Sequence, residues 1–94
     1  MNKAEAVFEL GELSVHIEDV IAEIKAGRYD EDGDLSYEVA VAHLMDHLVR
    51  AWHYAHMTDE KIAGITEDDF DKITCAIPLL QFEYRLVDPY TEIV

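Results

Sequence analysis

Histidine is the residue type of this sequence best suited to chemistry, and four of the five histidines fall between residues 43 and 56. His43 and His47 are four positions apart, a spacing that puts two imidazoles on one side of a helix, where they can share a metal ion. Asp46 is adjacent and could supply a carboxylate oxygen or orient one of the rings. The sequence therefore contains one candidate metal site: His43, His47 and Asp46.

This candidate site is short of ligands. A closed structural zinc site has four protein ligands. The remainder would have to come from His16 together with Glu12 or Asp19, or from another chain. Because two histidines at this spacing also arise by chance, the sequence favours a solvated histidine face over a metal site, and we expect no cofactor.

A second candidate site is a group of acidic side chains that resembles the start of an EF-hand calcium loop. Asp30, Asp32 and Asp34 fall at the first, third and fifth positions of such a loop. The pattern then fails at Leu35, where the loop requires glycine, and at Val41, where a bidentate glutamate should complete the coordination. We expect only weak, nonspecific cation association there.

The elements that position these residues follow from hydrophobic periodicity. Apolar residues recur at alternating intervals of four and three over residues 3–26 and again over residues 35–57, which predicts two amphipathic helices. The two stripes are Ala6, Leu10, Leu13, Ile17, Val20 and Ile24, and Tyr37, Val41, Leu44, Leu48, Ala51 or Trp52, and Ala55. Gly27 is predicted to cap the first helix in a left-handed conformation. The short connector predicts an antiparallel hairpin, with His43 and His47 nearly opposite the second stripe.

A third long helix is predicted to begin after Thr66, whose side chain caps it in a capping box with Asp69. A short helical turn should precede it. Pro78 is expected to kink or break this helix and Pro89 to end it. The sequence thus predicts a single all-α domain over residues 1–94: a small bundle of three main helices, the hairpin plus a proline-kinked third helix.

The third helix carries two apolar stripes, and a three-helix bundle can bury only one of them. The stripes are Phe70, Ile73, Ile77, Leu80 and Tyr84 on one side, and Cys75, Leu79, Phe82 and Leu86 on the other. A two-fold dimer that buries Leu79, Phe82 and Leu86 is the simplest solution. The alternative is a monomer in which Pro78 redirects the helix so that both stripes meet the core.

The charge composition excludes some classes of partner. The 94 residues include 21 Asp and Glu against seven Lys and Arg, a formal net charge of −14. This excess opposes binding to nucleic acid and to anionic membranes, but it suits a basic protein partner. No stretch approaches the roughly 18 apolar residues of a membrane span, and glutamates interrupt the N-terminal run that a signal peptide needs, so we expect a cytoplasmic protein.

No nucleophile–base pair, glycine-rich phosphate loop or paired-cysteine motif is present in the sequence. An enzyme would therefore require a catalytic metal on the histidine face, and a non-enzymatic role is favoured. We predict a homodimer that acts by binding another protein. The alternatives are a metal-dependent function (storage, sensing or hydrolysis) at His43 and His47, and an acidic inhibitor, immunity protein or DNA mimic that neutralises a basic target.

Overall fold

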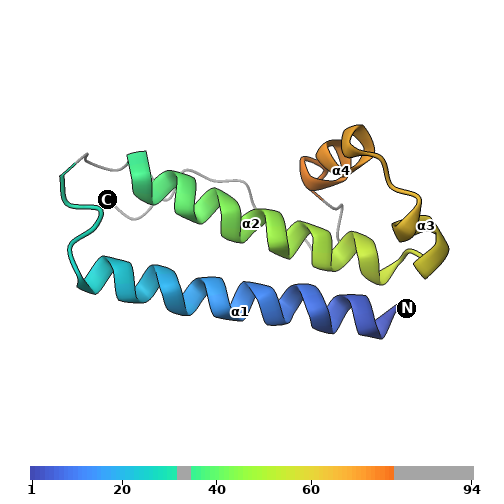
Figure 1. Cartoon of the computed structure of the whole chain (residues 1–94), viewed down its shortest axis with the longest axis horizontal. Helices are drawn as coiled ribbons and strands as arrows, with labels where there is room; N and C mark the ends of the chain where they lie inside the picture. Colours follow the sequence, from blue (N-terminus) through green and yellow to red (C-terminus); the bar gives the residue numbers. More distant parts are fainter. Residues whose placement is uncertain (32–34, 78–94) are drawn as a thin grey trace, which may run out of the picture.

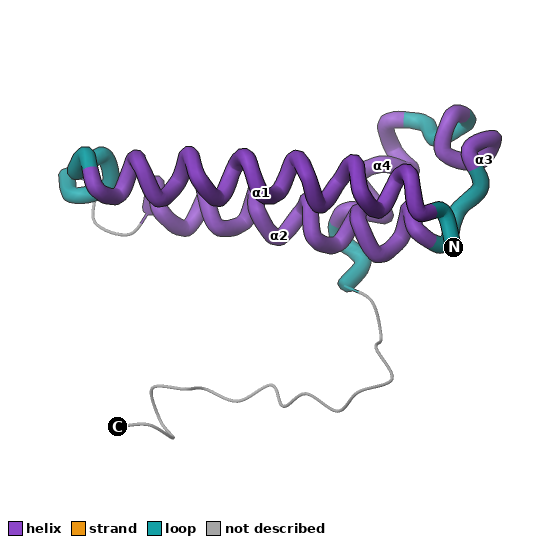
Figure 2. Tube along the Cα trace, turned by 90° about the horizontal axis from the view of Figure 1, so that it is seen from below, coloured by secondary structure: helices purple, strands orange, loops and turns teal. Residues whose placement is uncertain are grey.

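The computed structural model describes residues 1–31 and 35–77. Within these ranges the chain forms four helices and no strand: α1 (Lys3–Lys25), α2 (Leu35–Ala55), α3 (Asp59–Ala63) and α4 (Glu67–Thr74). Figures 1 and 2 show α1 and α2 side by side along their length, while α3 and α4 follow at the C-terminal end of α2. The predicted all-α fold with an antiparallel hairpin is confirmed.

The C-terminal end of α1 has the predicted glycine cap. Gly27 has φ of +80°, and the N–H groups of Gly27 and Arg28 donate to the carbonyls of Ile24 (3.1 Å) and Glu23 (3.0 Å). This pair of bonds is a Schellman motif, which satisfies carbonyls that the helix leaves without partners. It also turns the chain toward α2.

The N-terminal end of α1 is tied to the far end of the hairpin by Asn2. Its side-chain oxygen accepts from the Glu5 N–H (3.3 Å) and caps the helix. Its amide nitrogen donates to the carbonyl of Met57 (3.1 Å) and to Asp59 (2.8 Å), and its backbone N–H donates to Ala55 (2.6 Å). These bonds hold the start of α1 against the junction of α2 and α3.

Helix α4 begins as predicted but ends early. Thr66 and Asp69 form the capping box, with backbone-to-side-chain distances of 3.1 and 3.3 Å. The helix ends at Thr74, and Cys75 is its C-cap, so within the described residues the predicted interruption near Pro78 is a helix end rather than a kink. Proline disfavours the helical conformation in the residue before it, which accounts for an end ahead of Pro78.

Residues 78–94 lie outside the described residues. They include Leu79, Phe82 and Leu86, the predicted dimer interface, and Pro89, the predicted end of the helix. The interface at these three residues stays a prediction.

The interface between α1 and α2 is polar at its centre, which the sequence did not predict. Glu9, His47 and Arg50 are 6%, 8% and 7% exposed, whereas the stripe residues Leu10 and Leu48 are 47% and 56% exposed. The expectation that His47 lies on a solvated face is therefore wrong. These polar groups tolerate burial because they pair with one another, and every buried side-chain nitrogen or oxygen in residues 1–31 and 35–77 has a hydrogen-bond partner.

Among the described helices, none combines the length and the apolarity needed to cross a bilayer. Helix α4 packs against α2, close to the buried polar residues. The fold thus brings three polar side chains from two helices together beside a third helix.

Candidate metal site

Three histidines meet across the hairpin. His16 comes from α1, and His43 and His47 come from successive turns of α2. The three ring centroids are 4.8 Å apart in every pair. One ligand nitrogen from each ring can be chosen so that all three lie within 4.8 Å of one another. The hairpin therefore brings three imidazole rings into one cluster.

The two histidines of α2 already have the spacing of ligands to one ion. Their Nε2 atoms are 3.3 Å apart. Two nitrogens that bind a tetrahedral zinc at about 2.0–2.1 Å are themselves separated by about 3.4 Å. A metal ion can replace the hydrogen bond between these rings without moving α2. His16, which is half-buried, offers a third ligand nitrogen within 4.8 Å of those of the other two histidines.

Glu9 orients the ring of His47 from behind. Its Oε2 atom lies 2.9 Å from Nδ1 of His47, and both side chains are buried. An ionised carboxylate only accepts hydrogen bonds, so Nδ1 carries the hydrogen and Nε2 keeps its lone pair. A carboxylate that holds a histidine in this tautomer is the usual support of a metal-binding imidazole.

Arg50 balances the charge of Glu9. Its Nε atom is 3.5 Å from Oε1 of Glu9. One of its terminal nitrogens lies 3.2 Å from Nδ1 of His47, but it cannot donate to that atom while Nδ1 carries the hydrogen that it donates to Glu9. The guanidinium also lies 5.0 Å from the ring centroid of Phe70 and donates to Thr74 at 3.5 Å. Arg50 thus links the histidine cluster to α4 while it compensates a buried carboxylate.

The electrostatics of the cluster favour a neutral ring at His43. Burial lowers the pKa of His43, and the neighbouring His47 and His16 lower it further, while the Asp46 carboxylate acts in the opposite direction. Neutral imidazole is the form that binds metal, because the protonated ring has no free lone pair. At neutral pH His43 is therefore ready to act as a ligand.

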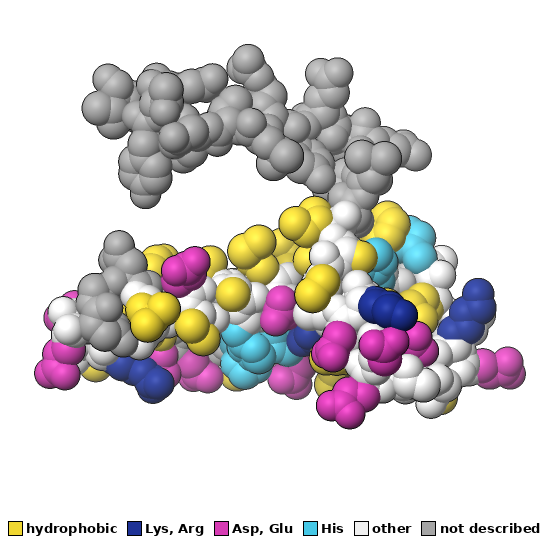
Figure 3. Space-filling model, turned by 90° about the horizontal axis from the view of Figure 1, so that it is seen from above, with side chains coloured by type: hydrophobic (Ala, Val, Ile, Leu, Met, Phe, Trp, Pro, Cys, Tyr) yellow, Lys and Arg dark blue, Asp and Glu magenta, His cyan; other side chains and the backbone are white. Residues whose placement is uncertain are grey.

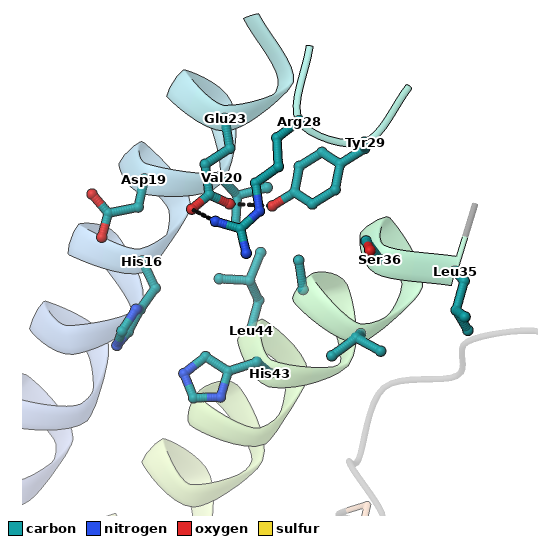
Figure 4. A pocket seen from close by; sticks show the side chains of 12 residues that line it. His16, Asp19, Val20, Glu23, Arg28, Tyr29, Leu35, Ser36, His43 and Leu44 are labelled. Carbon is teal, nitrogen blue, oxygen red and sulfur yellow. Dashed lines mark hydrogen bonds and ion pairs between the residues drawn. The ribbon is translucent and has the colours of Figure 1, made fainter. Parts of the chain in front are cut away.

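The cluster opens into a pocket of about 540 Å³ between the two helices. Figure 4 shows His16 and His43 at one end of this pocket, and Glu23, Arg28 and Tyr29 at the other. Arg28 (3.2 Å) and the Tyr29 hydroxyl both donate to the Glu23 carboxylate. Solvent reaches His16 and His43 through this pocket, which leaves room for an exogenous fourth ligand.

The structure changes the membership of the predicted site. His43 and His47 come together as the sequence proposed, and His16 joins them. Asp46 is outside the three-histidine group and acts on His43 through its charge. Of the acidic loop, Asp32 and Asp34 lie outside the described residues.

Sequence analysis missed Glu9, and it placed Arg50 on the same side of the helix as His43 and His47 without giving it a role in the site. Glu9 precedes His16 by seven residues and Arg50 follows His47 by three, so each lies on the same side of its helix as a histidine. That spacing was the available signal. His53, near the end of α2, and His56, just after it, are outside the cluster. They hydrogen-bond to the carbonyls of Ala76 and Trp52, respectively.

No protein-family model, curated protein or solved structure matches this chain. The fold and the site together describe a helical hairpin that carries three histidines and a supporting carboxylate across its interface. The geometry of this cluster is the basis for the function proposed next.

Proposed function

We propose that the protein reversibly binds one transition-metal ion of the zinc class between α1 and α2, through His16, His43 and His47. The observation that carries this proposal is the Nε2–Nε2 distance of 3.3 Å between His43 and His47, with Glu9 bonded to the far nitrogen of His47. A hydrogen-bonded histidine pair alone would not need a buried carboxylate behind it. Both features are typical of metal-binding histidines.

The ligand set indicates the kind of metal and the kind of site. Imidazole nitrogens suit zinc, copper, iron and nickel, whereas calcium and magnesium prefer oxygen. Three protein ligands leave a fourth position to water or another small ligand, unlike a closed structural site. Storage or sensing of the ion in the cytoplasm is therefore the function that we favour.

A competition titration with a chromophoric zinc chelator tests the proposal. The wild-type chain should bind one equivalent of zinc. His16→Gln should weaken the affinity by at least about 100-fold, because losing a ligand costs more than losing its support. His56→Gln is the matched control, since this exposed histidine of the same chain bonds to the Trp52 carbonyl, and it should bind as the wild type does.

Two outcomes would contradict the proposal. The first is a wild-type chain that leaves the chelator saturated. The second is an equal loss of affinity in His16→Gln and His56→Gln, which would mean that zinc binds surface histidines without selection.

A further inference from the structure

An apolar face of the hairpin is left uncovered by the described elements. Leu10, Ile17 and Ile24 recur at every seventh position of α1 and are 47%, 39% and 48% exposed. Leu48 and Trp52 of α2 are 56% and 37% exposed. These five residues are called the apolar face. Because each helical residue turns by about 100° and the helices are antiparallel, both rows lie on the side of the hairpin away from His43.

The apolar stripe of α1 is divided between two directions. Ala6 is buried, and Leu13 and Val20 are half-buried, while the residues of the apolar face point outward. Two such rows at alternating intervals of three and four are typical of a helix that packs against two neighbours in a four-helix bundle. Among the described elements, α2 is the helix that α1 packs against. The described residues therefore provide one of the two neighbours that this pattern predicts for α1.

The hairpin buries little apolar surface without that neighbour. Its buried hydrophobic residues are Ala6, Ala51, Tyr54 and Ala55, and none of the described large side chains is fully buried. Helices in proteins owe most of their stability to packing of an apolar face. In Figure 3 hydrophobic side chains gather in a row along one edge of the hairpin, and most acidic side chains lie toward the other.

The positions of the acidic residues indicate which kind of partner covers the apolar face. The chain carries a net charge of −14, yet no acidic residue of α1 or α2 falls within the angular sector of the apolar face. On α1 the acids Glu12, Asp19 and Glu23 lie on the opposite flank. A basic partner would find no anion to pair with on the apolar face, whereas an equally acidic chain can approach it with its own acids held at the rim.

We propose that the apolar face packs against the same face of a second copy, around a two-fold axis, to form a four-helix bundle. A two-fold axis places the apolar face of one copy against the same face of the other, so apolar side chains meet apolar side chains. The helices are about 33 Å long and the pair about 20 Å wide, so two faces would bury about 1,300 Å², above the roughly 1,000 Å² that a stable interface needs. This interface is separate from Leu79, Phe82 and Leu86, and the proposal is independent of metal binding.

Light scattering after size exclusion tests the proposal on the full chain without metal. At tens of micromolar the mass should be twice 10.8 kDa. Ile17→Glu combined with Leu48→Glu should give the monomer mass. Phe8→Glu combined with Val15→Glu is the matched control, because these residues are 60% and 55% exposed and lie on the side of α1 opposite to Ile17, and it should stay dimeric.

Trp52 provides a second measurement that needs no substitution. It is the only tryptophan of the chain and belongs to the apolar face. Its emission should shift to longer wavelength on dilution, at the concentration where the mass falls. This readout holds even if the double glutamate variant loses its helical circular dichroism.

Three results would overturn the proposal. One is a wild-type monomer at tens of micromolar, which would mean that the rest of the same chain or water covers the face. Another is a dimer whose dissociation leaves the Trp52 emission unchanged. The third is a dimer that Leu79→Glu with Phe82→Glu disrupts while Ile17→Glu with Leu48→Glu does not.

Discussion

The Nδ1 atom of His47 lies 2.9 Å from the Oε2 atom of Glu9, although the two residues are 38 positions apart in the chain. This contact joins α2 to α1 at the centre of their interface. It fixes the tautomer of His47 and directs the lone pair of Nε2 toward His43. A hydrogen bond that links the two helices thus also orients a candidate metal ligand.

Replacing Glu9 should weaken metal binding while leaving all three ligands in place. In Glu9→Gln the side chain keeps its size but loses the carboxylate that accepts the hydrogen bond from Nδ1 of His47. We expect zinc affinity to fall by about 10- to 100-fold, measured by chelator competition. Glu18→Gln removes an exposed glutamate of the same helix and should leave the affinity unchanged. Equal affinities for both variants would show that Glu9 does not support the site.

Arg50 should matter for stability far more than an exposed cation does. Arg50→Met leaves the buried carboxylate of Glu9 without its guanidinium partner, and we expect a loss of about 3 kcal/mol in the free energy of unfolding. Lys72→Met removes the cation of a surface pair with Asp68, whose side chains are 73% and 77% exposed, and should cost less than about 0.5 kcal/mol. Urea denaturation measures both. Similar values for the two variants would contradict the compensating role of Arg50.

Two glycines should respond to alanine in opposite directions. Gly27 has φ of +80°, and a Cβ there would lie 3.0 Å from Oδ2 of Asp30, so Gly27→Ala should destabilise the fold by about 1 kcal/mol. Gly11 lies inside α1 with open space around it, so Gly11→Ala should stabilise the fold by about 0.5–1 kcal/mol through helix propensity. Urea midpoints of both variants test this, and a stabilising Gly27→Ala would refute the left-handed cap.

The metal-free protein should lose stability as the pH falls below about 6.5, the ordinary pKa of histidine. The pKa of His43 is lowered in the folded state, first by burial and then by His47 and His16. Protons therefore bind the unfolded chain first, and the stability present above pH 6.5 is lost as the pH falls through the lower folded value. His43→Gln should flatten the decline of the melting temperature between pH 7 and pH 5. An unchanged slope in His43→Gln would assign the decline to other groups.

Local features of this chain could be predicted from its sequence, and the inward face of the hairpin could not. The Gly27 cap and the capping box of Thr66 and Asp69 depend on residues within a few positions of one another, and both are present. The orientation of α2 depends on Glu9 and Arg50. Glu9 provides a hydrogen-bond partner for the buried His47, and Arg50 compensates its charge, but only once the two helices are packed together. Apolar spacing alone assigns Leu48 to the core and His47 to solvent. In the structure Leu48 is exposed and His47 is buried beside its charged partners.

Zinc K-edge X-ray absorption of the one-equivalent complex tests the central claim most directly, because it counts imidazole ligands. A site formed by His16, His43 and His47 predicts a first shell of nitrogen and oxygen at about 2.0 Å, with outer-shell scattering from three imidazole rings in the wild type and two in His16→Gln. A wild-type spectrum with two rings or fewer, or an equal ring count in the two proteins, would show that the ion does not bind between the helices.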